Sequence, residues 1–190
     1  TCPHYLFYNK SVLKKYGNFA KINPPIRLNS DKRALWDGIY NNDIDILASD
    51  HAGFCYDEKT NEIEIEKAPP GHPGVNSMIY TLMNKIDNKK FKLENIIELC
   101  SINPAKRFGL FPKKGSININ NNADITIINL NKTHEYSLQN QFSKSKKSDV
   151  LYTNNKYKGK IEYTIVNGDI VYNGSTIDEK NKPGKFLNPN

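Results

Sequence analysis

The stretch IDILASDHAGF, residues 44–54, limits more than any other what this chain can fold into. Its apolar run over residues 44–48 ends abruptly in polar residues, and Gly53 follows a few positions later. Apolar runs of this length that are closed by turn residues are typical of strands buried on both faces. Barrel and open α/β enzymes place their chemistry at the C-terminal ends of such strands. We therefore expect Asp50 to lie at the end of a core strand.

Asp50 has two interpretations at this position. A carboxylate at the end of a core strand can bind a metal ion or move a proton. Asp is also a frequent helix N-cap and loop residue, where its oxygens accept hydrogen bonds from nearby N–H groups. The position alone leaves both interpretations open.

Length and composition narrow the class of protein. A chain of 190 residues can form one or two domains with a buried core. The net charge of +7 is scattered along the chain without a compact basic run, so we expect no nucleic-acid partner. No run approaches the roughly 20 apolar residues of a membrane span, and no signal peptide is visible, so we expect no membrane partner. The three cysteines lack metal-ligand spacing and disulfide pairing, which favours a reducing, cytoplasmic location.

The first part of the chain predicts a strand, a rigid turn and a helix. Residues 1–8 are rich in β-formers and predict a strand that emerges into a loop. Two prolines follow Asn23 and force a stiff, extended backbone, which suits a binding residue. The alternative is that Asn23 caps a local turn. Ser30 is expected to cap a helix over residues 31–42. That helix leads into the strand over residues 44–48, as in a repeating βα unit.

The rest of the chain predicts helices followed by a β-rich part. Apolar residues at helical spacing predict helices over residues 75–86 and 93–100. A third helix is expected to begin at Asn103 as its N-cap, because a proline follows at the first helical position.

From residue 113 the pattern changes to short strands and turns. A strand is expected over residues 123–130, and a hairpin over residues 161–172. The pair Asn167-Gly168 inside that hairpin is typical of a type I′ turn.

Several motifs together resemble the cyclic amidohydrolases of the dihydroorotase, hydantoinase and allantoinase type. The motifs are TCPHYL at the start, NPP at 23–25, SDHAGF at 49–54, APPGHPG at 68–74 and NPA…FGL at 103–110. They occur in the family's order and cover nearly the whole chain. The resemblance implies an α/β fold: the C-terminal part of a metal-dependent (β/α)8 TIM barrel over residues 1–112, and part of a small β-sandwich domain over 113–190. The resemblance also implies that this chain is a fragment of such an enzyme and is inactive by itself, because the other metal ligands of the family are expected before residue 1.

The resemblance further implies the site residues. Asp50 matches the Asp at the end of the eighth barrel strand, which binds metal and is the catalytic base. Asn23, Pro70 and Gly71 match positions that contact the substrate ring, although a Pro-Gly pair is also an ordinary turn. His51 is a candidate to orient either the loop or the Asp50 carboxylate, or simply packs. Other candidates receive no site role: His4 is not a family metal ligand, His72 and His134 are expected at the surface, and Cys55 is expected to be buried.

The resemblance implies one or two divalent metal ions, with Zn2+ the first candidate, a small-molecule cyclic amide substrate and a homo-oligomer. Dihydroorotase, which interconverts dihydroorotate and N-carbamoyl-aspartate in pyrimidine synthesis, is the first candidate activity. Dihydropyrimidinase, hydantoinase and allantoinase are alternatives. Phe54 stands where dihydroorotases usually carry a His that binds the substrate carboxylate. Because of this difference, the identity of the substrate stays open, and the protein could instead be a non-catalytic scaffold subunit of the same fold.

Overall fold

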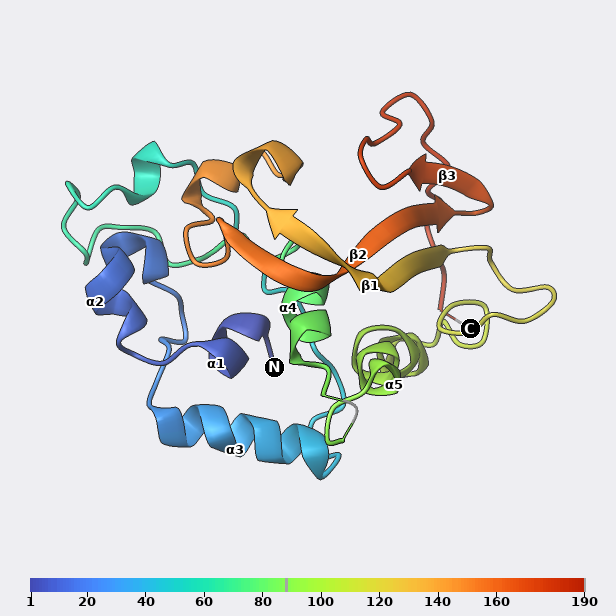
Figure 1. The fold of residues 1–190 in the computed structure, drawn as a ribbon, viewed down its shortest axis with the longest axis horizontal. Coiled ribbons are helices and arrows are strands. Elements are labelled where there is room, and N and C mark those ends of the chain that lie inside the picture. Colours follow the sequence, from blue (N-terminus) through green and yellow to red (C-terminus); the bar gives the residue numbers. More distant parts are fainter. Residues whose placement is uncertain (88, 190) are drawn as a thin grey trace. The chain divides into compact units, whose positions relative to one another are not determined.

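The computed structural model describes residues 1–87 and 89–189 and shows a mixed α/β chain with one small sheet (Figure 1). Its internal contacts divide the chain into two units. The first unit combines Thr1–Leu82 with Glu135–Lys156, and the second combines Met83–His134 with the residues from Tyr157 onward. Among the helices of the described residues, none is long and apolar enough to cross a membrane.

The N-terminal segment is helical where the sequence predicted a strand. Helix α1 spans Pro3–Phe7, and Cys2 before it is extended. Pro3 lacks an N–H and has a fixed φ, which suits the first turn of a helix and outweighs the β-forming residues that follow it. Thr1 alone keeps strand-like pairing: its amine donates to the carbonyl of Ile46, and its carbonyl accepts from the N–H of Ala48, each over 3.0 Å.

The predicted strand over residues 44–48 is likewise not a regular strand. The segment is extended, but it belongs to no sheet among the described residues. Thr1 makes two backbone hydrogen bonds with the segment, and the N–H of Ile44 donates to the carbonyl of Gly38 over 3.2 Å. These isolated bonds do not make a ladder. Leu47 is the residue of this run that is fully buried, with 3% of its surface exposed. The expectation of a strand buried on both faces is therefore wrong for this chain.

Helix α3, Asn29–Tyr40, confirms the helix predicted over residues 31–42 but begins earlier. Its N-cap is Leu28 rather than the expected Ser30. The Asp31 carboxylate accepts a hydrogen bond from the Leu28 N–H over 2.8 Å, so this acidic side chain satisfies a donor at the helix start. On its inner side α3 packs against α1 in the first unit.

Helix α5, Leu93–Ile97, does not end where the sequence predicted. It continues through a single π turn, Glu98–Ile102, into α6, Asn103–Arg107. Asn103 has helical angles, φ −65° and ψ −43°, so it is not the expected N-cap. Pro104 supplies no N–H to the ladder, and a wider π turn is a common way to accommodate such a break.

The other helical segments are short. Helix α4, Met78–Lys85, confirms the amphipathic helix predicted over residues 75–86. Besides these, the structure has α2, Val12–Tyr16, and 3-10 turns at Gly17–Ala20, Asp57–Lys59, Leu138–Asn140 and Lys146–Ser148.

The sheet contains three strands in the order β1-β2-β3: β1 is Ile125–Tyr136, β2 is Asn155–Val166 and β3 is Asp169–Tyr172 (Figure 1). Strands β2 and β3 pair antiparallel around Asn167 and Gly168, whose φ values are 49° and 92°. Positive φ at both central residues is what a type I′ turn requires, so the predicted hairpin is confirmed. Strand β1 begins two residues after the predicted start at residue 123 and continues six residues past the predicted end at residue 130.

Candidate functional site

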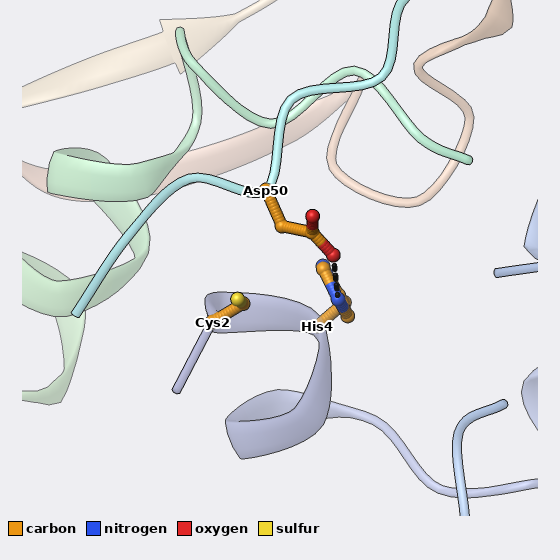
Figure 2. Close-up of side chains that lie close together, drawn as sticks. All are labelled: Cys2, His4 and Asp50. Atoms are coloured by element: carbon orange, nitrogen blue, oxygen red, sulfur yellow. Dashed lines mark ion pairs between the residues drawn. The ribbon is translucent and has the colours of Figure 1, made fainter. Parts of the chain in front are cut away.

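Asp50 lies two positions after the extended segment over residues 44–48, with Ser49 between them. Its φ is +47°, a left-handed conformation that Asp adopts more readily than most residues. The side chain is 46% exposed, and its Oδ2 lies 3.4 Å from Nε2 of His4 (Figure 2). Asp50 is therefore placed at the end of an extended segment, as expected, with its carboxylate facing α1.

Helix α1 supplies the other side chains at this position. The helix begins immediately after Cys2 and contains His4, and both side chains lie beside Asp50 (Figure 2). One ligand atom from each of the three residues lies within 4.8 Å of the other two. Among residues 1–87 and 89–189, these three form the single cluster of His, Cys and acidic side chains able to hold a metal ion.

Burial dominates the electrostatics of this cluster. It lowers the pKa of His4 to about 4, with a further contribution from His72, so the ring is neutral at neutral pH. The 3.4 Å approach to Asp50 lacks hydrogen-bond geometry, and Nε2 of His4 has no hydrogen-bond partner among the described residues. Burial also raises the pKa of the Cys2 thiol; the Asp50 charge adds to this, and the positive N-terminus opposes it.

Tyr5 links the cluster to the predicted substrate segment. Burial raises the pKa of Tyr5 to about 12, and the charges of Asp50 and Cys2 add to the shift. Its hydroxyl donates to the carbonyl of Pro24 over 2.7 Å. Asn23, which precedes Pro24, is exposed.

His51 faces the Pro/Gly loop. Its Nδ1 accepts the N–H of Gly74 over 3.2 Å and makes a longer contact of 3.4 Å with the N–H of Val75. The neighbouring N–H of Ala52 donates to the carbonyl of His72 over 3.0 Å. Of the roles expected for His51, this geometry corresponds to holding the loop.

Lys59 organises the loop that contains Pro70 and Gly71. The side chain is fully buried, and its Nζ donates to the carbonyls of Lys21 over 3.1 Å, Pro69 over 3.0 Å and Gly71. Burial lowers the pKa of Lys59 to about 8, and the charge of Lys21 adds to this. The N–H of Gly71 donates to the carbonyl of Lys21 over 2.9 Å, so the loop lies beside the segment that leads to Asn23.

Gly71 has no room for a side chain. A Cβ there would lie 2.5 Å from Cβ of Ala52 and 2.7 Å from Cε2 of Phe54. The Phe54 ring is therefore close to the loop, and the ammonium of Lys59 lies 5.9 Å from its centroid. The backbone carbonyl of Phe54 accepts the Ser148 hydroxyl over 2.7 Å.

Three side chains differ from their expected exposure. The His72 side chain is 1% exposed, and its Nε2 lies 3.1 Å from Oδ1 of Asp149, which is also buried. His134 is also buried, at 8% exposure, and Cys55 is exposed rather than buried. Sequence patterns report local periodicity and could not place these side chains against distant segments.

Sequence reasoning also missed four residues of the site region: Asp149, Lys59, Cys2 and His4. Asp149 lies in a polar, basic loop and carries no local sign of burial. Lys59 lies between the SDHAGF and APPGHPG motifs, outside both. Cys2 and His4 belong to the TCPHYL motif, which contained them without revealing their contacts.

Comparisons with known proteins show which family the chain belongs to. The chain is 35% identical to a dihydroorotase from Endomicrobium trichonymphae over 173 residues, which is 90% of this chain and 40% of that protein. It is 31% identical to an allantoinase from Solibacter usitatus over 190 residues, which is 100% of this chain and 40% of that protein. The chain thus spans about 40% of the length of these curated relatives.

Solved structures show the same fold. A D-hydantoinase from Bacillus sp. AR9 matches 98% of this chain with a TM-score of 0.85 at 21% identity, over 42% of its own length. A dihydropyrimidinase from Brevibacillus agri matches 94% of this chain with a TM-score of 0.83 at 22% identity, over 40% of its own length. The model of the amidohydrolase family matches residues 4–171. Since this match covers most of the chain, the chain belongs to the amidohydrolase family.

Proposed function

We propose that the whole protein is a metal-dependent hydrolase of cyclic amides, with dihydroorotase as the first candidate. The observation that carries this proposal is the placement of Asp50, an accessible carboxylate at the end of an extended segment in a chain of this family. The dihydroorotases at 33–35% identity over about 90% of the chain support the choice of activity. The reaction interconverts dihydroorotate and N-carbamoyl-aspartate.

We propose that residues 1–112 are the C-terminal portion of a (β/α)8 TIM barrel and residues 113–190 the C-terminal part of a small β-sandwich domain. Parallel pairing of Thr1 with the segment at Ile46 and Ala48, joined through α3, supports a barrel βα unit. The β-rich sequence after residue 113 supports a second domain.

The donor chemistry of the site fits a divalent metal. Asp50 presents an accessible carboxylate with one oxygen turned away from His4, and carboxylate oxygen is an ordinary zinc ligand. A bound zinc ion would lower the pKa of a water molecule and polarise the amide carbonyl. Asp50 would be the ligand that this chain contributes, and the other ligands would come from parts of the whole protein that match the remaining length of its relatives.

Asp50 would then move the proton. A carboxylate oxygen of Asp50 accepts the proton of the attacking water and delivers it to the ring nitrogen as the C–N bond breaks. The protonated nitrogen leaves as the free end of the opened ring, so the carboxylate returns to its ionised form.

The ring would be positioned by Asn23 and by the loop at Pro70. Because Pro70 has no N–H of its own, its backbone can bind the substrate ring only through its carbonyl, which accepts a hydrogen bond from an N–H of the ring. The N–H and carbonyl of Gly71 are already engaged by Lys21 and Lys59. Gly71 therefore serves by its small size, which lets the loop lie close to Ala52.

Phe54 supports a second candidate, a dihydropyrimidinase, hydantoinase or allantoinase. Its ring lies beside Gly71. It stands at the position where dihydroorotases usually carry a His that binds the substrate carboxylate. An aromatic ring cannot pair with that carboxylate, whereas it suits an uncharged ring substituent. A scaffold subunit without activity is the alternative from another class. In each case we expect a cytoplasmic homo-oligomer.

Ring-opening assays on the protein, with all chain beyond these residues included and zinc supplied, test the proposal. Dihydroorotate, dihydrouracil, hydantoin and allantoin are compared side by side. Asp50→Asn should reduce kcat on the active substrate by about 10²–10⁴, the usual contribution of a general base. Asp43→Asn, at an exposed aspartate of the turn before the segment, should retain activity. A zinc-loaded protein that opens none of the four rings would favour the scaffold.

A further inference from the structure

We propose that Cys2, His4 and Asp50 bind a single thiophilic divalent cation of the zinc and cadmium class. This inference goes beyond the proposed hydrolase activity and does not require it, because Cys2 and His4 have no part in that reaction. The three ligands belong to one unit of the chain and converge from two segments, α1 with its N-cap and the residues after the extended run.

The distances fit tetrahedral coordination. Zinc bonds to nitrogen and carboxylate oxygen are about 2.0–2.2 Å, so two such ligand atoms in a tetrahedral site lie about 3.4 Å apart. Nε2 of His4 and Oδ2 of Asp50 are 3.4 Å apart already. No ligand atom of the three is farther than 4.8 Å from another. A rotation of the Cys2 side chain, which is half-buried beside them, can close the remaining gap.

The unpartnered nitrogen of His4 points to a ligand independently of the cluster. The His4 side chain is 2% exposed, and its Nε2 has no hydrogen-bond partner among the described residues. Buried polar atoms of this kind are rare, because leaving one unsatisfied costs about 1–3 kcal/mol. A cation at this position would satisfy the nitrogen.

The ligand types select the class of ion. Thiolate sulfur with imidazole nitrogen is preferred by zinc-like ions, whereas magnesium and calcium take oxygen ligands. One carboxylate oxygen of Asp50 faces His4, and the other points away in Figure 2. Asp50 can therefore contribute one oxygen to this cation and keep the other for a second ion. Three protein ligands leave a fourth tetrahedral position open.

Cobalt(II) reports on the proposed site because thiolate ligation gives it a charge-transfer absorption in the near ultraviolet. Metal is first removed from the protein with a chelator, and Co2+ is then titrated. We expect a saturable charge-transfer band that Zn2+ and Cd2+ displace. Cys2→Ser should abolish the band, and His4→Gln should weaken Co2+ binding by about tenfold or more.

The other two cysteines provide matched controls. Cys55→Ser and Cys100→Ser should leave the band unchanged, because neither residue belongs to the cluster. A band that survives Cys2→Ser, or that is absent from the wild-type protein, would overturn the proposal.

A second measurement needs no variant and so does not depend on how Cys2→Ser folds. The wild-type protein is alkylated with iodoacetamide with and without Cd2+, and each cysteine is followed by mass spectrometry. Cd2+ should protect Cys2 selectively, and equal modification of Cys2 in both samples would contradict the site. Ring-opening activity without Cys2 protection would leave the proposed function standing and overturn this inference alone.

Discussion

At the scale of single residues, Lys59 shows how one side chain can shape a loop. A fully buried ammonium is costly unless its protons have acceptors, and here three backbone carbonyls supply them. Two of these carbonyls, of Pro69 and Gly71, flank Pro70. Lys59 therefore ties the predicted substrate loop to the segment at Lys21.

Replacing Lys59 with methionine tests this tie. Lys59→Met keeps most of the apolar length but leaves buried carbonyls without their donor. We expect the free energy of unfolding to fall by about 2–4 kcal/mol in urea denaturation. In an active protein KM should rise more than kcat falls, because the loop binds the ring and Asp50 moves the proton.

Lys67→Met is the control. The Lys67 side chain is exposed and forms an ion pair with Glu64, so we expect the free energy of unfolding to change by no more than about 0.5 kcal/mol. Equal stability of the two variants would contradict the role of Lys59.

At the scale of elements, two short turns carry strong local constraints. The β2–β3 hairpin turns at Asn167 and Gly168, both at positive φ. The loop before α5 is held by Asp87, whose Oδ1 accepts three backbone N–H groups, from Lys89 and Lys90 over 2.9 Å and from Phe91 over 3.0 Å. Each constraint can be tested without disturbing the core.

The hairpin turn is tested by a pair of glycine substitutions. Gly168→Ala should destabilise the protein by about 1 kcal/mol, because a side chain at φ +92° is strained although no atom lies within 4 Å of the added Cβ. Gly184→Ala has the same open surroundings without a positive φ and should be nearly neutral. The comparison of thermal midpoints isolates backbone strain. Identical midpoints would show that the turn tolerates alanine.

The Asp87 loop predicts an acid-sensitive element. The N–H of Phe91, followed by those of Lys89 and Lys90, lowers the pKa of Asp87 from 3.8 to about 2. Asp87 therefore binds a proton more readily in the unfolded chain than in the folded one. The stability that the ionised Asp87 gives to the folded chain is complete above pH 3.8 and is lost as the pH falls toward 2. Thermal unfolding against pH should show this loss in the wild type. In Asp87→Asn, which keeps an acceptor but does not titrate, this part of the pH dependence should disappear. The same slope in both proteins would assign the acid sensitivity to other groups.

At the scale of the whole molecule, the first unit is built from two stretches far apart in sequence. Thr1–Leu82 and Glu135–Lys156 are joined by hydrogen bonds, and Asp149 is central to them. Its Oδ2 accepts the Tyr136 hydroxyl over 2.8 Å, and its Oδ1 lies 3.1 Å from Nε2 of His72. The Tyr136 bond lies within the second stretch, and the His72 contact joins that stretch to the first, as does the bond from the Ser148 hydroxyl to the carbonyl of Phe54.

Removing Asp149 should loosen that stretch. Asp149→Ala leaves the Tyr136 hydroxyl and the His72 ring without their acceptor in a buried place, and we expect a loss of about 3–5 kcal/mol in unfolding free energy. Tyr136→Phe removes one donor and should cost about 1 kcal/mol. Hydrogen exchange should rise across residues 135–156 in Asp149→Ala more than in Tyr136→Phe. Unchanged protection in both variants would show that the network does not hold the stretch.

The sequence by itself determined the features that depend on neighbouring residues. Helical spacing located α3 and α4, the pair Asn167-Gly168 located the hairpin turn, and an apolar run that ends abruptly singled out Asp50. Each of these follows from backbone conformation or periodicity over a few residues. Where local preferences compete, as Pro3 does with the β-formers after it, the sequence prediction was wrong.

The tertiary structure alone decided which side chains meet. Cys2 and His4 reach Asp50, and His72 reaches Asp149, across 46 or more positions of chain. Such pairs are set by how segments pack, because packing brings together residues whose separation in sequence carries no periodic pattern. Burial then lowers the pKa of His4 to about 4, and within residues 1–87 and 89–189 its Nε2 finds no hydrogen-bond partner. The candidate ligand Asp50 was visible in the sequence, and the cluster around it exists only because the chain folds.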